Sequence, residues 1–110
     1  MKMEHQQLAA GKWQELSLAE QLANVGAEVG RALRWQEKGN AEYSRLAFER
    51  ALELIDLTID DGNNKNRLKE IIRLREALAD YFTAGNSYKQ TADSLNNYFY
   101  SFNFKARTAI

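Results

Sequence analysis

The chain has 110 residues, enough for one domain with a single hydrophobic core. Its 45% hydrophobic and 27% charged residues exclude an intrinsically disordered chain. Fifteen basic residues balance fifteen acidic ones, and a net charge of zero disfavours nucleic-acid binding without excluding a local basic patch. Cysteine is absent, no run approaches the roughly 18 apolar residues of a membrane span, and the N-terminus lacks a signal-peptide pattern. We therefore expect a cytoplasmic protein that does not enter a membrane.

The N-terminal part of the chain predicts a flexible arm followed by a helix. Residues 1–16 read as the arm, in which Trp13 is expected to fold back as a hydrophobic anchor. The helix begins after Ser17, because its hydroxyl and the carboxylate of Glu20 have the spacing of a capping box. It ends before Gly39, a residue typical of helix C-termini.

Three further helices follow in the same way. The second spans about residues 40–60 and ends at a glycine and asparagine turn, 62–64. The third is predicted over 65–84 and the fourth over 91–107. Helices of this length joined by short links favour antiparallel neighbours. We therefore predict an all-α fold, a four-helix up-down bundle formed by residues 17–110.

Small residues flank the apolar stripe of the first helix. Ala19, Ala23, Gly26 and Gly30 share one side. Each glycine costs about 1 kcal/mol in a helix interior, so this pattern predicts that a neighbouring helix approaches closely there. On the third helix, the predicted inward face consists of Leu68, Ile71, Ile72, Leu78, Ala79 and Phe82.

The second helix has more apolar surface than one core requires, since apolar side chains cover well over half of its circumference. Uncovered apolar patches commonly mark a partner, and symmetric dimers are the commonest oligomers. We therefore predict a homodimer, and a second protein partner stays open. The candidate interface residues are Trp35, Phe48, Leu52, Ile55, Ile59, Tyr100 and Phe104. In the alternative, the segment around Trp13 or residues 86–90 cover these groups within one chain.

Carboxylates line one side of the second helix, at Glu49, Glu53, Asp56 and Asp60. Carboxylates at this spacing can hold Mg²⁺ together, although a solvated, salt-bridged face is the simpler interpretation. The segment 53–56 also resembles half of the paired acidic motif of all-α nucleotide pyrophosphohydrolases, and the other half is missing. The only histidine is His5, so histidine-based catalysis lacks its central residue, and no nucleotide-binding loop motif is present. The sequence thus indicates no catalytic residue and no cofactor.

Arginines offer a candidate anion site. Arg75 and Arg50 are predicted within apolar faces, where a guanidinium must be paired. The expected acceptors are carboxylates such as Glu49, Glu53 and Glu76, or acidic residues of a partner subunit. A salt bridge that fixes helix register is one interpretation. The other is recognition of an anionic ligand or RNA, for which the candidates are Arg67, Arg73 and Arg75.

Several segments resemble a short prokaryotic helical family, chiefly residues 21–29, 50–58, 67–76 and 80–82. The general pattern is similar to the HEPN-like helical bundles, dimers that are often tied to toxin–antitoxin or nucleotidyltransferase systems. The arginine–histidine motif of active HEPN ribonucleases has no counterpart here, so the resemblance implies a binding or scaffold role. The preferred hypothesis is a non-catalytic, homodimeric interaction protein. An RNA- or nucleotide-associated HEPN-like protein and a divalent-metal pyrophosphohydrolase are the alternatives.

Overall fold

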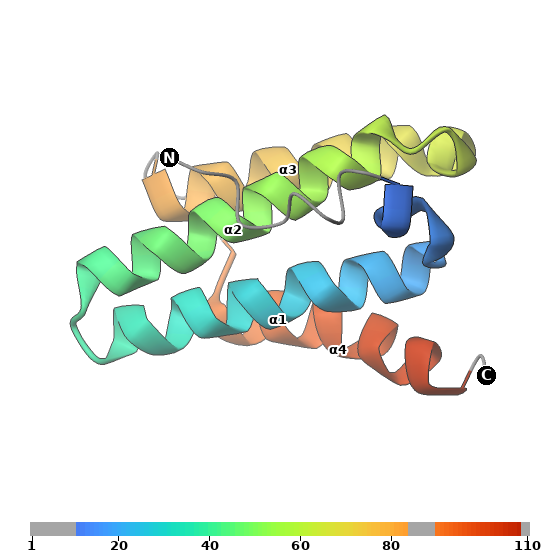
Figure 1. The fold of residues 1–110 in the computed structure, drawn as a ribbon. Coiled ribbons are helices and arrows are strands. Elements are labelled where there is room, and N and C mark those ends of the chain that lie inside the picture. Colours follow the sequence, from blue (N-terminus) through green and yellow to red (C-terminus); the bar gives the residue numbers. More distant parts are fainter. Residues whose placement is uncertain (1–10, 84–89, 109–110) are drawn as a thin grey trace.

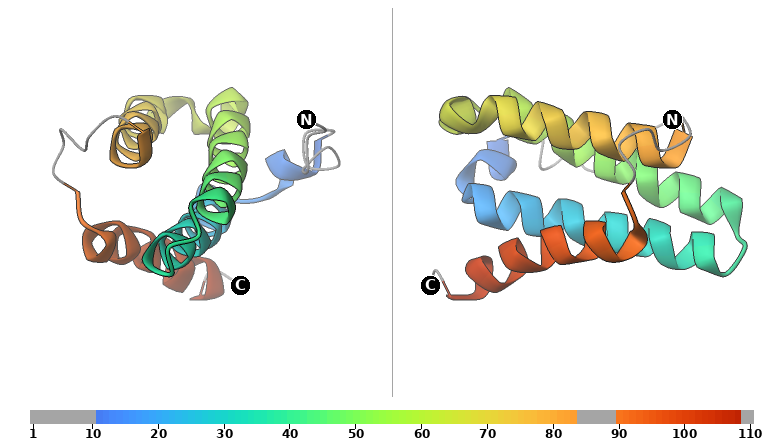
Figure 2. Two further views of the ribbon diagram at one scale, coloured as in Figure 1. Left: turned by 90° about the vertical axis from the view of Figure 1, so that its left-hand side faces the viewer. Right: turned by 180° about the vertical axis from the view of Figure 1, so that it is seen from behind.

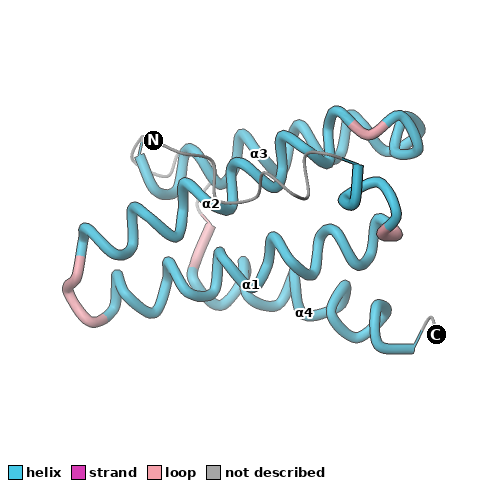
Figure 3. Tube along the Cα trace, viewed as in Figure 1, coloured by secondary structure: helices cyan, strands magenta, loops and turns pink. Residues whose placement is uncertain are grey.

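Helices form nearly all of the computed structural model, which describes residues 11–83 and 90–108, with the side chains of 101–108 excepted. The four long helices are α1 (Leu18–Glu37), α2 (Ala41–Asp60), α3 (Leu68–Thr83) and α4 (Ala92–Thr108). They alternate in direction along the chain (Figure 1), and a short loop joins α1 to α2 (Figure 3). The predicted all-α four-helix bundle is confirmed. Within the described residues, no helix combines the length and the apolar character needed to cross a membrane.

Local polar groups set the ends of α1 and the start of α2. The Ser17 hydroxyl accepts a hydrogen bond from the Glu20 amide at 3.1 Å, and the Glu20 carboxylate accepts one from the Ser17 amide at 2.8 Å. Gly39 follows α1 with φ of 79°, a left-handed conformation that favours glycine. The side chain of Asn40 then accepts a hydrogen bond from the Tyr43 amide at 3.0 Å and caps α2. The predicted capping box and glycine stop are confirmed.

The link between α2 and α3 differs from the prediction. The expected turn at 62–64 belongs to a 3-10 helix, η3 (Gly62–Arg67), and α3 begins at Leu68 rather than near residue 65. The carboxylate of Asp61 starts η3 by accepting a hydrogen bond from the Asn63 amide at 3.0 Å. Asn64 is buried within this short helix.

A buried polar network ties the N-terminal segment to this link. Trp13, in the short 3-10 helix η2 (Trp13–Glu15), is fully buried, and its indole donates a hydrogen bond to the Thr58 hydroxyl at 3.1 Å. The fully buried side chain of Gln21 donates to the Trp13 carbonyl and to the Asp61 carboxylate, both at 2.9 Å. Asn64 donates to Gln21 at 2.8 Å and so closes the network. The predicted Trp13 anchor is confirmed, and residues 13–16 are part of the packed bundle rather than a free arm.

The wide apolar arc of α2 is covered within the chain. α2 packs against α1, α3 and η2. Phe48 is 6% exposed and its ring stacks on that of Phe82 in α3, with 4.8 Å between the ring centres. Ile55 has no exposed surface. Phe48 and Ile55 are therefore core residues, and their assignment to a dimer interface is wrong because α2 has neighbours on more than one side.

The small residues of α1 allow α4 to approach closely. A Cβ atom at Gly26 would lie 2.5 Å from the Cβ atom of Phe99, closer than two such atoms can come. The predicted close contact is confirmed at this position. At Gly30 the nearest atom would be a terminal guanidinium nitrogen of Arg34, at 3.3 Å.

α3 and α4 form the open side of the bundle. α1 packs against both α2 and α4, whereas α3 packs mainly against α2. The two views in Figure 2 show α3 and α4 set apart, with the paired helices α1 and α2 joining them. On the far side of α3, Ile72 is 39% exposed, so its predicted inward orientation is wrong.

Candidate interaction surface

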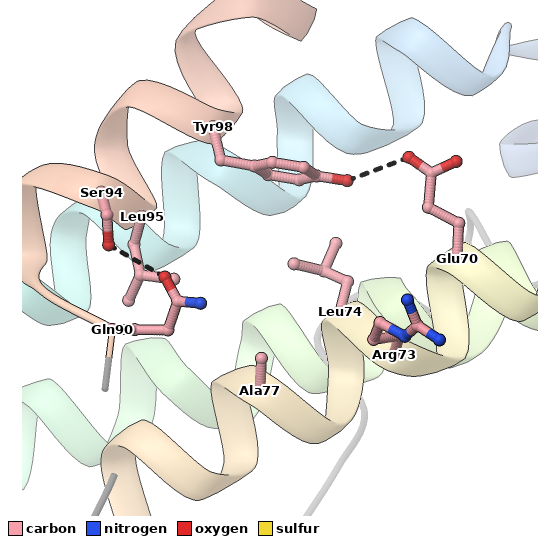
Figure 4. Close-up of a pocket in the computed structure, with 8 residues that line it drawn as sticks. All are labelled: Glu70, Arg73, Leu74, Ala77, Gln90, Ser94, Leu95 and Tyr98. Atoms are coloured by element: carbon pink, nitrogen blue, oxygen red, sulfur yellow. Dashed lines mark hydrogen bonds between the residues drawn. The ribbon is translucent and has the colours of Figure 1, made fainter. Parts of the chain in front are cut away.

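A groove of about 270 Å³ lies between α3 and α4. Residues of both helices and of the segment before α4 line it: Glu70, Arg73, Leu74, Ala77, Gln90, Ser94, Leu95 and Tyr98. Figure 4 shows the side chains of Leu74 and Ala77 rising from α3 and those of Leu95 and Tyr98 entering from α4. We refer to these eight residues as the α3/α4 groove. Its floor is apolar and its rim carries the polar and charged groups, which is typical of a surface that packs against another protein.

Tyr98 crosses the opening and connects the two helices. Its hydroxyl donates a hydrogen bond to the carboxylate of Glu70 at 3.4 Å (Figure 4). Burial, the negative charge of Glu70 and this hydrogen bond raise the pKa of Tyr98 to about 12. The hydroxyl therefore stays protonated well above physiological pH and acts as a donor rather than as a base.

The groove rim carries one arginine that has no ion pair among the described residues. Arg67, the last residue of η3, pairs with Glu70 at 2.8 Å. Arg73 is exposed and lines the groove. Its side chain makes neither a hydrogen bond nor an ion pair with the described part of the chain.

Arg75 and Arg50 take acceptors other than those expected. Arg75 extends from α3 to Asp56 on α2, with 2.8 Å between nitrogen and oxygen, and both side chains are largely exposed. Arg50 on α2 pairs with Glu28 on α1 at 2.9 Å, and Glu28 also binds Arg31. Glu28 and Asp56 were not among the expected acceptors, because carboxylates of neighbouring helices can be placed only once the helices are packed. Both pairs join two helices, as the structural interpretation predicted. The three anion-site candidates Arg67, Arg73 and Arg75 thus have separate surroundings.

The acidic stripe of α2 does not converge into a metal site. Glu49 pairs with Arg45, and Asp56 with Arg75. Asp60 is exposed, whereas one carboxylate oxygen of Glu53 is buried without a hydrogen-bond partner in the described structure. Among residues 11–83 and 90–100, no three carboxylate, histidine or cysteine side chains come close enough to hold a metal ion.

The other predicted interface residues differ in burial and in their neighbours. Leu52 and Ile59 are partly buried and pack against the core. Trp35 is partly buried, with its ring edge-on to that of Tyr43 at 4.9 Å. Tyr100 is 69% exposed and lines a hollow between α1 and α4, outside the α3/α4 groove. The side chain of Phe104 lies outside the described residues.

Sequence reasoning missed the groove because its apolar members have ordinary core spacing. Leu74 and Leu95 are almost fully buried, at 8% and 3% exposure, and nothing local distinguishes them from residues under a closed bundle. The separation of α3 from α4 is a tertiary property.

The fold and the surface together define a four-helix bundle with one open apolar side. Comparison of the chain with protein-family models, with curated proteins and with solved structures finds no match. The similarity to HEPN-like bundles therefore remains a prediction, and function has to be argued from geometry.

Proposed function

We propose that this protein is a non-catalytic interaction module that assembles as a homodimer through the α3/α4 groove. The observation that carries the proposal is the groove itself: an apolar floor reached from two helices that do not close on each other. Burying apolar surface of this kind against a partner stabilises the complex by about 25 cal/mol per Å² of apolar area removed from water.

The surroundings of the charged groups also support a binding role. Glu49 and Asp56 of α2 bind two different arginines, and the Tyr98 hydroxyl is held in its protonated form. Of the three arginines considered for anion recognition, Arg67 and Arg75 are neutralised by carboxylates of the same chain. These arrangements favour packing over proton transfer, metal chemistry or phosphate binding.

The proposal is tested by sedimentation velocity of the full chain over a range of concentrations. We expect a reversible dimer, and Ala77→Glu should convert it to a monomer because this change places a charge on the groove floor. Ile72→Glu is the matched control, since it introduces the same side chain on the same helix at an exposed position outside the groove. Circular dichroism checks that both variants keep their helix content.

A wild-type chain that sediments as a monomer at all concentrations would contradict the proposal. So would a dimer that Ala77→Glu leaves intact, because the association would then use a different surface.

A further inference from the structure

The charges on the α3 side of the groove are self-complementary. Glu70 and Arg73 are three residues apart on α3 and both line the groove, so they lie on neighbouring turns of one helix face. One is an anion and the other a cation. When two copies of such a face meet with their helices antiparallel, each cation comes opposite the anion of the other copy.

The interactions that Arg73 and Glu70 already make leave both side chains able to bind a second copy. Arg73 is exposed and makes no ion pair within the described residues. Glu70 is also exposed and binds Arg67 and Tyr98, but a carboxylate has about four acceptor sites, so it can take a further donor. The rim therefore has one unused cation and one carboxylate with spare capacity.

The Tyr98–Glu70 hydrogen bond shows which parts of α3 and α4 are level with each other. Because this bond crosses the groove, Tyr98 lies opposite Glu70 (Figure 4). A two-fold axis that lies between the copies and crosses α3 midway between Glu70 and Arg73 stacks α3 on α3 and α4 on α4, with each pair antiparallel. Leu74 and Leu95 lie within one helical turn of Arg73 and Tyr98, so part of each apolar floor lies beside this axis.

We infer that a second copy of this chain covers the groove face to face about such an axis, with Arg73 of each copy paired to Glu70 of the partner subunit. This inference rests on the proposed function and adds the orientation and the register of the dimer. The two ion pairs form at the exposed rim, where they select the register, while the floor supplies apolar contact.

Two single charge reversals test the pairing between subunits. Arg73→Glu gives a copy with two acidic rim groups, and Glu70→Arg gives a copy with two basic ones. Each variant alone should dimerise with a Kd raised about tenfold or more, because both reciprocal pairs become like-charge contacts. In a mixture of the two variants, both pairs are restored across the interface. The mixed dimer should therefore form about tenfold more tightly than either variant alone, although Glu70→Arg also removes the Tyr98–Glu70 hydrogen bond within one copy.

Arg34 and Glu37 provide the matched control. They are an exposed arginine and glutamate three residues apart on α1, away from the groove. Arg34→Glu and Glu37→Arg change the net charge by the same amounts, and their mixture should associate no more tightly than either variant alone.

Sedimentation velocity of each variant and of the mixtures separates the outcomes. A mixture of the groove variants that associates no better than its components overturns the inferred register. In that case a dimer that Ala77→Glu still disrupts leaves the proposed function standing. A wild-type chain that remains a monomer removes both.

Discussion

At the scale of single residues, the structure shows how polar groups are satisfied inside a helical bundle. The buried amide of Gln21 is held by the Trp13 carbonyl, Asp61 and Asn64. Buried polar groups cost free energy unless they are hydrogen-bonded, so this network fixes one arrangement of η2, α1 and η3. Tyr98 has a comparable role at the open side, where it joins α3 to α4.

The titration of Tyr98 predicts a pH dependence of stability. In the unfolded chain the hydroxyl titrates near the ordinary pKa of 10.0, whereas in the fold the pKa is about 12. Between these values the unfolded state binds fewer protons, so the free energy of unfolding should fall as the pH rises through the window. Below pH 10 this contribution is fully present.

Urea denaturation of the wild type and of Tyr98→Phe across this window measures the effect. The variant lacks the titrating hydroxyl and should lose less stability over the same range. Parallel pH profiles would show that the fold does not raise the pKa of Tyr98.

At the scale of elements, the packing of α4 depends on one glycine of α1. Gly26 allows the backbone of α1 to meet Phe99. The atoms nearest to a Cβ at Gly30, one turn later, are the ends of two side chains, Arg34 at 3.3 Å and Asn96 at 3.8 Å. The two glycines occur in similar sequence surroundings, and only the position of α4 distinguishes them.

This difference predicts opposite effects for the same substitution. Gly26→Ala should destabilise the protein by about 1–3 kcal/mol, because the added methyl group overlaps Phe99 and forces α4 to move. Gly30→Ala should be neutral or stabilise by up to about 1 kcal/mol, since alanine is the better helix former and the guanidinium of Arg34 can shift. Urea denaturation measures both changes. Equal stabilisation by the two variants would show that α4 does not pack on Gly26.

At the scale of the whole molecule, the proposed dimer links stability to concentration. Because mass action favours a folded dimer at high concentration, Tm should rise by about 5 °C over a hundredfold increase in protein. Ala77→Glu should abolish this dependence while Ile72→Glu keeps it. Scanning calorimetry at several concentrations measures the effect, and a constant wild-type Tm would contradict a dimer that is coupled to folding.

The sequence by itself determined the four long helices, although not the 3-10 helix between α2 and α3. The capping box at Ser17, the stop at Gly39 and the apolar periodicity are local signals, and local hydrogen bonds and side-chain spacing decide where a helix begins and ends. The close approach at Gly26 could also be foreseen, because glycines in a helix interior need a packing reason.

Only the tertiary structure decided which apolar surface is covered. The sequence shows that α2 has apolar side chains on several sides, but it cannot show that α3 shields Phe48 or that α3 and α4 stay apart. The acceptors of Arg50 and Arg75 depend in the same way on how helices are placed. Periodicity records that a side chain avoids water, and it carries no information on which neighbour excludes the water.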